Sequence, residues 1–465
     1  MELHEYASRD AVGLRELIEA EEVSAAEVET VARQALERAN AELNGLAMPL
    51  FSPALDHAVD GPLGGVPFLI KDSGPFAEGV PFFLGSRSLG PGVVARHDHD
   101  LMTRFRAAGL VTLGLTTMPE LGVSFSTESV KHGPTRNPWR LDRGVGGSSG
   151  GAAALVAAGA VPLAHANDSA GSIRVPASCC GLVGLKPTRG RTPCGPDQGE
   201  AVFGTAYDFA VTRTVRDAVA LLDAVAGPGV GDKYTAPPYP AESRTGTLRV
   251  AVTTVAWSGV AVDPEVAAVA VRAGRVLEGL GHVVTEASPV VDWGMALRAA
   301  MLEVIALGAP LLTARRRPDP ARMEAVSRRI LELAAATTGL DLIAGFDAQN
   351  AVSRPVGAFF TRHDLLITPT LGQLPLPHGV LRYDDPDHTV ESWLKSVFDY
   401  GPFTLVFNIS GQPAISLPLG HSANGLPIGV QVVAPTGRED LLLRIAAVLE
   451  EAMPWRDRVP PDGLR

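Results

Sequence analysis

Apolar and polar positions along the chain follow helical and strand periods in turn. Residues 24–40 are predicted to form a helix, because Ser24 and Glu27 make a capping box and apolar residues follow at helical spacing. Residues 66–70 then form a short, wholly apolar strand pattern that ends at Lys71. A charged side chain at the end of a buried strand lies where α/β proteins keep their chemistry.

The alternation of helix and strand patterns continues to the end of the chain. Further helices are expected at 100–108, 152–158, 215–225, 263–280 and 438–452, with a mostly helical region at 293–362. Strands are expected at 110–115, 161–166, 248–253, 283–285, 364–370, 414–419 and 428–433. No internal repeat or low-complexity linker divides residues 1–465. We therefore expect one large α/β domain whose mixed, mainly parallel twisted sheet is covered by helices on both faces.

Composition and charge narrow the class of protein. Hydrophobic residues make up 46% and charged residues 20% of the 465 residues, which is ordinary for a globular protein. The net charge of -11 is spread along the chain, so we expect no nucleic-acid partner. The densest basic run, residues 315–317, precedes a Pro-Asp-Pro segment and is predicted to be a solvated turn.

The N-terminus and the cysteines predict a cytoplasmic protein. The first residues carry acids and no apolar core of a signal peptide follows them. No stretch approaches the ~18 uninterrupted apolar residues of a membrane span. Cys179, Cys180 and Cys194 are too few for a disulfide framework and are interpreted as small buried residues rather than nucleophiles. The sequence leaves a homodimer open.

Glycines are concentrated around two serines in residues 144–151. Ser148 and Ser149 lie among five glycines, directly before the small-residue helix expected at 152–158. A turn at a helix N-terminus can present side chains and backbone N–H groups to a developing negative charge. Taken alone, the segment is equally typical of a flexible or phosphate-binding glycine loop.

A second small-residue turn follows the strand expected at 161–166 and ends in Ser172. The backbone N–H groups of this turn can converge on one point and form an oxyanion hole; they belong to Ser169, Ala170, Gly171 and Ser172. A serine nucleophile needs a base, and none of the eleven histidines has a recognisable triad context. Lys71 ends an apolar strand, where burial pushes a lysine pKa below its usual ~10.4. For an isolated lysine, a surface cation remains the simpler interpretation.

The joint pattern is more specific than its parts. A lysine after an apolar strand, Gly-Gly-Ser-Ser-Gly-Gly at 146–151, Gly-Ser-Ile-Arg at 171–174 and the segment 181–188 together resemble the amidase signature family. The likeness is strong over about 62–200 and 364–435 and weak over 293–362; further similar segments are 118–120, 136–139, 411–414 and 425–431. Residues 165–172 and 437–440 are most similar to the branch of 6-aminohexanoate cyclic dimer hydrolases.

The resemblance implies an amidase that works through an acyl-enzyme. Ser172 would be the nucleophile, Ser148 a bridging hydroxyl held by a cis peptide, and Lys71 the base that receives the proton. It also implies a small-molecule amide as partner and no metal or organic cofactor. Ala170 stands where the family usually has glycine, which matters only if the turn needs a positive φ there.

The resemblance also nominates residues around this machinery. Asp168 and Arg174 flank the nucleophile turn and are expected to hold it rigid rather than to react. The substrate pocket is expected largely from residues 293–400, and the lining residues nominated by motif position are Phe125, Ser126, Val406, Phe407, Asn408 and Ile409. These are mostly uncharged, so we expect neutral linear or cyclic amides as substrates. The acyl and amine groups of the substrate are not fixed by the sequence.

Four alternatives remain in view. Residues 147–151 match the Gly-x-Ser-x-Gly elbow of α/β-hydrolases, which would make Ser149 an esterase nucleophile, but residues 141–144 have no strand pattern. An amidase subunit of a glutamine-dependent amidotransferase is disfavoured by the acidic balance. A non-catalytic relative would be expected to have lost one of the three catalytic residues. Residues 97–100 invite a metal site, but a polar loop is favoured because ligands so close in sequence rarely converge on one ion.

Overall fold

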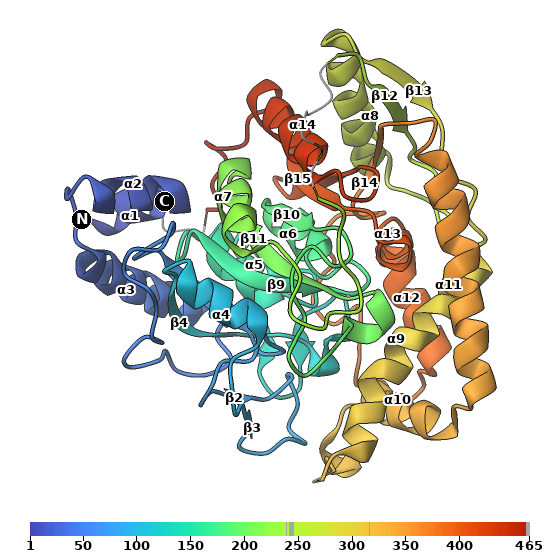
Figure 1. Cartoon of the computed structure of the whole chain (residues 1–465), viewed down its shortest axis with the longest axis horizontal. Helices are drawn as coiled ribbons and strands as arrows, with labels where there is room; N and C mark the ends of the chain where they lie inside the picture. The colour runs from blue at the N-terminus through green and yellow to red at the C-terminus, as the bar shows by residue number, and fades with distance from the viewer. Residues whose placement is uncertain (239, 241–245, 316, 462–465) are drawn as a thin grey trace.

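The computed structural model describes residues 1–238, 240, 246–315 and 317–461, so Arg316 of the basic run lies outside the described residues (Figure 1). An eight-stranded sheet has the order β13-β12-β14-β16-β15-β10-β11-β9. Its strands are β9 (Leu163–Asp168), β10 (Val183–Lys186), β11 (Tyr207–Thr212), β12 (Arg249–Val252), β13 (Val283–Glu286), β14 (Leu365–Pro369), β15 (Ala414–His421) and β16 (Pro427–Val433).

The sheet is mixed, as expected, but the expectation of mainly parallel pairing is wrong. β12 pairs in parallel with β13 and β14, whereas every other neighbouring pair is antiparallel. β15 and β16 are joined by a tight turn, which permits only antiparallel pairing, whereas parallel neighbours need a crossover such as the helix between β12 and β13. Strands covered on both faces are apolar in either direction, so the sequence pattern does not reveal strand direction.

Smaller strand pairs surround this sheet. β1 (Pro67–Lys71) pairs in parallel with β4 (Val111–Thr116) and packs beside β9. The other pairs are β2 (Pro81–Phe82) with β3 (Val93–Val94), β5 (Glu128–Ser129) with β6 (Gly133–Pro134), and β7 (Arg136–Asn137) with β8 (Arg140–Gly144). β8 corrects the expectation that residues 141–144 form no strand. Arg140 and Asp142 of this strand are exposed, and Leu141 and Arg143 are half-buried, so a search for apolar strands does not detect it.

Helices cover the eight-stranded sheet in two layers. α5 (Gly150–Ala157) packs against α6 (Arg174–Cys180) and β9. α14 (Glu439–Ala452) packs against α7 (Val215–Val225) and α8 (Pro264–Gly279), which lie over the strands. The first predicted helix is α3 (Ala25–Leu43), and it has the predicted capping box, but two helices precede it, α1 (Leu3–Ser8) and α2 (Ala11–Glu19). The remaining helical elements outside residues 293–410 include α4 (Asp100–Ala107) and the 3₁₀ turns Glu120–Gly122 and Ala201–Gly204; a third 3₁₀ turn, Pro320–Arg322, lies within that region.

The region predicted to be mostly helical forms one side of the molecule (Figure 1). α9 (Trp293–Thr313) packs against both α10 (Ala325–Ala336) and α11 (Gly339–Phe359). Two shorter helices follow, α12 (Val390–Tyr400) and α13 (Leu405–Ser410), and α13 contacts α9 and α11. Among the described residues, α9 is the one helix long and apolar enough, by length and composition alone, to cross a membrane.

The core between the layers contains the two adjacent cysteines. Cys179 and Cys180 are fully buried on α6, as the sequence interpretation expected, whereas Cys194 is only partly buried; none of the three forms a disulfide. Burial raises the pKa of Cys179 to about 12 and that of Cys180 well above its ordinary value. Thiols with such pKa values carry almost no thiolate near neutral pH, so neither is an activated nucleophile.

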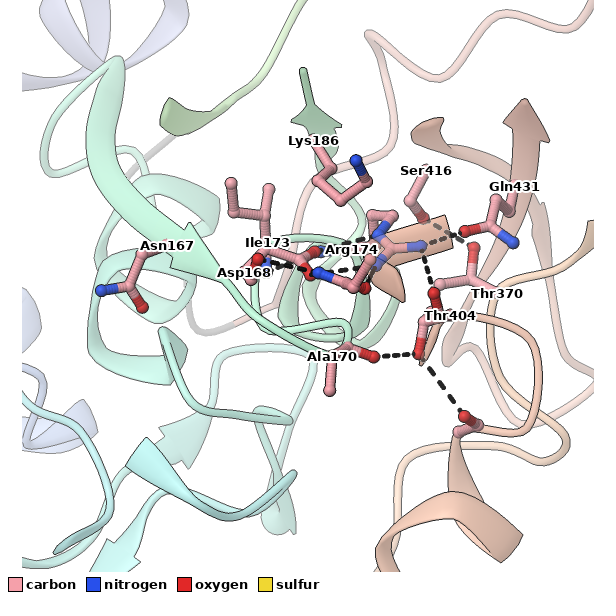
Figure 2. Close-up of polar contacts among 12 residues, drawn as sticks. Asn167, Asp168, Ala170, Ile173, Arg174, Lys186, Thr370, Thr404, Ser416 and Gln431 are labelled. Atoms are coloured by element: carbon pink, nitrogen blue, oxygen red, sulfur yellow. Dashed lines mark hydrogen bonds and ion pairs between the residues drawn. The ribbon is translucent and has the colours of Figure 1, made fainter. Parts of the chain in front are cut away.

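A buried ion pair connects the end of β9 to the start of α6 (Figure 2). Asp168 and Arg174 are both inaccessible to solvent, and the guanidinium donates from Nε to Oδ2 and from Nη2 to Oδ1, each at 2.9 Å. Nη1 of Arg174 also donates to Oε1 of Gln431 at 2.6 Å and to the carbonyl of Thr404 at 3.0 Å. One guanidinium therefore joins β9, α6, β16 and the segment before α13.

Asp168 stays ionised despite its burial. Burial alone would raise its pKa, but the Arg174 guanidinium and the Asn408 amide outweigh it and lower the pKa to about 2. Nδ2 of Asn408 donates to Oδ1 of Asp168 at 2.8 Å and to its carbonyl at 2.9 Å. Because the folded-state pKa is below the ordinary 3.8, the contribution to stability is present above that value and is lost as the pH falls through about 2.

Arg174→Met should destabilise the protein strongly, because it leaves the Asp168 carboxylate buried without its cation. We expect a loss of about 3–5 kcal/mol in the free energy of unfolding, measured by urea denaturation. Arg329→Met is the matched control: Arg329 pairs with Glu332 on an exposed helix surface, and such pairs contribute about 1 kcal/mol or less. Equal losses in the two variants would contradict a special role for the buried pair.

Candidate active site

Lys71 is the last residue of β1 and its side chain is completely buried. Its Nζ donates to Oγ of Ser148 at 2.7 Å and to Oδ1 of Asn167 at 2.5 Å. Asn167 is held in this orientation because its Nδ2 donates to Oγ of Ser73 at 2.8 Å. The structure thus brings together two of the predicted catalytic residues, and adds an amide partner that the sequence analysis did not name.

Burial controls the protonation of Lys71. It lowers the pKa of the amine from 10.5 to about 7, against the opposing effect of Asp208, Asp168 and Asp72. A substantial fraction of the amine is therefore neutral near pH 7 and can accept a proton. Because the unfolded chain binds this proton up to a higher pH, the free energy of unfolding gains a contribution as the pH rises from about 7 towards 10.5.

Ser148 and Ser149 precede the N-terminus of α5, and the Gly147–Ser148 peptide bond is cis. A Cβ added at Gly147 would lie 2.4 Å from the carbonyl oxygen of Ser124, so only glycine fits at this close backbone approach. Ser149 is fully buried and its Oγ donates to the carbonyl of Asn167 at 3.2 Å. This hydroxyl is occupied, and β8 before it lies outside the eight-stranded sheet, which disfavours the esterase elbow.

The turn that ends in Ser172 connects β9 to α6. Asp168 accepts the N–H groups of Ile173 and Arg174 on Oδ2, at 3.2 and 3.4 Å. Within the described part of the chain, none of the backbone N–H groups of residues 169–172 donates a hydrogen bond, and Oγ of Ser172 makes none either. Four adjacent free donors beside a serine hydroxyl can stabilise the oxyanion of a tetrahedral intermediate.

The alanine in this turn causes no backbone strain. Ala170 is not among the residues with positive φ, whereas Gly171 has a φ of 146°. A Cβ at Gly171 would lie 2.5 Å from Oγ1 of Thr404 and 3.0 Å from Cζ of Phe125, so the third position of the turn requires glycine. The carbonyl of Ala170 accepts from Oγ1 of Thr404 at 2.6 Å (Figure 2). Thr404 therefore fixes the turn from the α13 side.

The nominated lining residues fall into two groups. Phe125 lies next to Gly171, and with Ser126 it lines a small pocket that Tyr400 also lines. The other four belong to α13 and are wholly buried: Val406, Phe407, Asn408 and Ile409. Asn408 directs its side-chain hydrogen bonds to the Asp168–Arg174 pair and to the backbone, so α13 supports the turn from behind.

The sequence analysis missed an acidic group near the turn. Glu303 lies on α9, half-buried, and its carboxyl interacts with the hydroxyl of Ser169; burial raises its pKa to about 7. Asn167 could have been found from its position directly before Asp168. Thr404 lies two residues before the nominated Val406 and could have been found from that position. Glu303 is far from the motifs in sequence, and no local pattern indicates its place beside the turn.

The histidine-rich loop before α4 forms side-chain pairs with acids. Nε2 of His97 and Nε2 of His99 both lie against the carboxylate of Asp197, at 3.1 and 3.2 Å, and Asp98 pairs with Arg106 at 2.6 Å. In the part of the chain that the structure describes, no group of three or more His, Cys, Asp or Glu side chains could hold a metal ion.

Comparison with known proteins agrees with this geometry. The amidase family matches residues 15–443. A 6-aminohexanoate-cyclic-dimer hydrolase of Paenarthrobacter ureafaciens is 39% identical over 97% of this chain and 96% of its own length, and an acylamidase of Rhodococcus erythropolis is 36% identical over 87% and 84%. A solved 6-aminohexanoate cyclic dimer hydrolase in complex with substrate superposes with a TM-score of 0.92 at 38% identity, covering 98% of this chain and 99% of that one. The chain therefore belongs to the amidase signature family and is a hydrolase of carbon–nitrogen bonds other than peptide bonds.

Proposed function

We propose that this amidase cleaves neutral linear or cyclic amides through an acyl-enzyme on Ser172, with Ser148 as bridging hydroxyl and Lys71 as base. The observation that carries the proposal is the buried amine of Lys71, 2.7 Å from Oγ of Ser148, with a pKa lowered to about 7. A neutral amine in hydrogen-bond contact with a serine is the activating group that an otherwise weak hydroxyl nucleophile needs.

Acylation begins with two proton transfers. Neutral Lys71 takes the proton of Ser148, and Ser148 takes that of Ser172 as Oγ of Ser172 attacks the amide carbonyl carbon. The carbonyl oxygen becomes an oxyanion that the free N–H groups of residues 169–172 stabilise. When the tetrahedral intermediate collapses, the C–N bond breaks and the proton returns through Ser148 to the leaving nitrogen.

Deacylation repeats these transfers with water as the nucleophile. Water gives a proton to the Ser148–Lys71 pair as its oxygen attacks the ester carbonyl of the acyl-enzyme. When this intermediate collapses, the bond to Oγ of Ser172 breaks, the proton passes through Ser148 to Oγ, and the carboxylic acid and free Ser172 are released. Base, nucleophile and oxyanion donors are all protein groups, so the cycle requires no metal or organic cofactor. Small esters enter the same acyl-enzyme and should be side substrates.

The substrate class follows from the surroundings of the turn. Phe125 offers an aromatic wall next to Gly171; of the acids near the turn, Asp168 is paired with Arg174, and Glu303 has its pKa raised to about 7. A fully charged ligand would have to leave water here without a fixed counter-ion, which is costly. A 6-aminohexanoate cyclic dimer, after which the Paenarthrobacter relative is named, has its amine and carboxylate joined in amide bonds and is neutral.

Neutral amides should be preferred over zwitterions. We expect kcat/KM for the 6-aminohexanoate cyclic dimer or for hexanamide to exceed that for glutamine by about 100-fold or more, because burying two uncompensated charges costs several kcal/mol. Steady-state assays of released amine or ammonia at one pH would measure the ratio. A preference for glutamine would reject this pocket assignment and favour an amidotransferase subunit.

Ser172→Ala should abolish covalent labelling by a fluorophosphonate, because the activated hydroxyl is removed. Intact-mass spectrometry would detect the adduct on the wild-type enzyme and its absence in the variant. Ser149→Ala is the matched control, since its hydroxyl is bound to a backbone carbonyl, and it should still be labelled. An adduct on Ser172→Ala would move the nucleophile elsewhere.

The pH profile should report the titration of Lys71. Because the amine must be neutral to accept a proton, kcat/KM should rise with pH along an acid limb with a midpoint near 7, the lowered pKa of Lys71. Lys71→Ala should lose this limb and about 1,000-fold or more in rate, on the order expected for loss of a general base. The exposed Lys233→Ala serves as control. A wild-type profile in Lys71→Ala would place the base at another residue.

A further inference from the structure

We propose that His165 and Asp208 act as a positioning pair for Lys71, with His165 holding its backbone and Asp208 tuning its amine by an unneutralised negative charge. This proposal rests on the proposed role of Lys71 as the base. Neither residue contacts a reacting atom, so their effect would be transmitted through Lys71.

The contacts define a chain of three residues. The ring of His165 is completely buried in β9; its Nδ1 accepts the backbone N–H of Lys71 at 3.3 Å, and its Nε2 lies 3.0 Å from Oδ1 of Asp208. A backbone N–H can only donate, so Nδ1 must be unprotonated and Nε2 must carry the proton that is donated to Asp208. Burial also lowers the pKa of His165, which keeps the ring neutral. The tautomer is therefore fixed by its two neighbours.

Strand register directs Asp208 towards the base. β9 and β11 pair antiparallel, with Asp208 directly opposite Asn167. Residues directly opposite each other, and residues two apart on one strand, point to the same face of a sheet. Asn167 and His165 both contact Lys71, so Asp208 projects from the same face as the two residues that hold the lysine.

Asp208 differs from the other acids that face Lys71. Asp168 on β9 is neutralised by its bidentate arginine, and Asp72, directly after β1, is buried, with its pKa raised to about 6. Within the described residues the carboxylate of Asp208 hydrogen-bonds only to the neutral ring of His165. It has the strongest effect among the acids that oppose the lowering of the Lys71 pKa. Its charge is therefore the one most free to stabilise the ammonium form.

Solvent moderates this effect without removing it. The side chain of Asp208 is 24% exposed, and Asp208 lines a small surface cleft that Asp232 also lines. A partly screened charge at second-neighbour distance shifts a pKa by less than the 1–3 units seen for contacts within ~4–6 Å. We therefore assign to Asp208 a shift of about half a unit to one unit in the titration of the base.

Asp208→Asn tests the proposal through the pH profile. Removing the negative charge destabilises the ammonium form of Lys71, so the acid limb of kcat/KM should move to lower pH by about half a unit to one unit. Asp208→Glu keeps the charge and should keep the midpoint. Asp232→Asn makes the same change in the same cleft, but Asp232 is not among the acids that act on Lys71, so its midpoint should stay at the wild-type value.

The pH midpoint distinguishes a tuning role of Asp208 from a merely structural one. A lower rate with an unchanged midpoint in Asp208→Asn would overturn the tuning, as would the same shift in Asp232→Asn. If Asp208→Asn fails to fold, the midpoint of Asp208→Glu decides, because a displaced midpoint despite retained charge would also overturn it. Loss of the limb in Lys71→Ala together with a fixed midpoint in Asp208→Asn would leave the base assignment standing and reject only the role of Asp208.

Discussion

The bidentate contact between Asp168 and Arg174 is the constraint on which the site depends. Both charges are buried, so each is tolerable only while the other is present. The same carboxylate accepts the N–H groups of Ile173 and Arg174 at the start of α6, whereas those of residues 169–172 have no hydrogen-bond partner in the described part of the chain. The ion pair therefore fixes the position of the turn whose free N–H groups are the proposed oxyanion donors.

Burial of Lys71, the proposed base, lowers the stability of the fold but supplies the neutral amine that the proposed mechanism needs. A lysine at the end of an apolar strand with its pKa lowered from 10.5 to about 7 costs about 5 kcal/mol relative to a solvated one. The structure offsets part of this cost through the hydroxyl of Ser148 and the amide of Asn167. Residues that would stabilise the ammonium further would also reduce the neutral fraction that can act as base, so the environment of Lys71 is a compromise.

The sequence predicted those elements correctly whose residue pattern lies within one short segment. The strand that ends at Lys71, the glycine turn before α5 and the turn before α6 each have a spacing that only a few backbone geometries satisfy. It failed where the deciding contact is remote: Glu303 and Asp208 come to the site through helix packing or strand register, which no single-sequence pattern contains. The predictions of mainly parallel pairing and of no strand at residues 141–144 were wrong for a related reason: an apolar pattern indicates which residues are buried, not how strands pair.

The proposed base and the turn that holds the proposed nucleophile belong to separate hydrogen-bonded sheets. β1 pairs with β4, whereas the turn with Ser172 follows β9 at the edge of the eight-stranded sheet. Among the described residues, no strand ladder joins β1 to β9; side chains such as Asn167 connect the two strands. A slip of one sheet relative to the other therefore disconnects the proton path while both sheets keep their own ladders. We therefore expect heat to inactivate the enzyme through a sub-global opening, before its secondary structure melts.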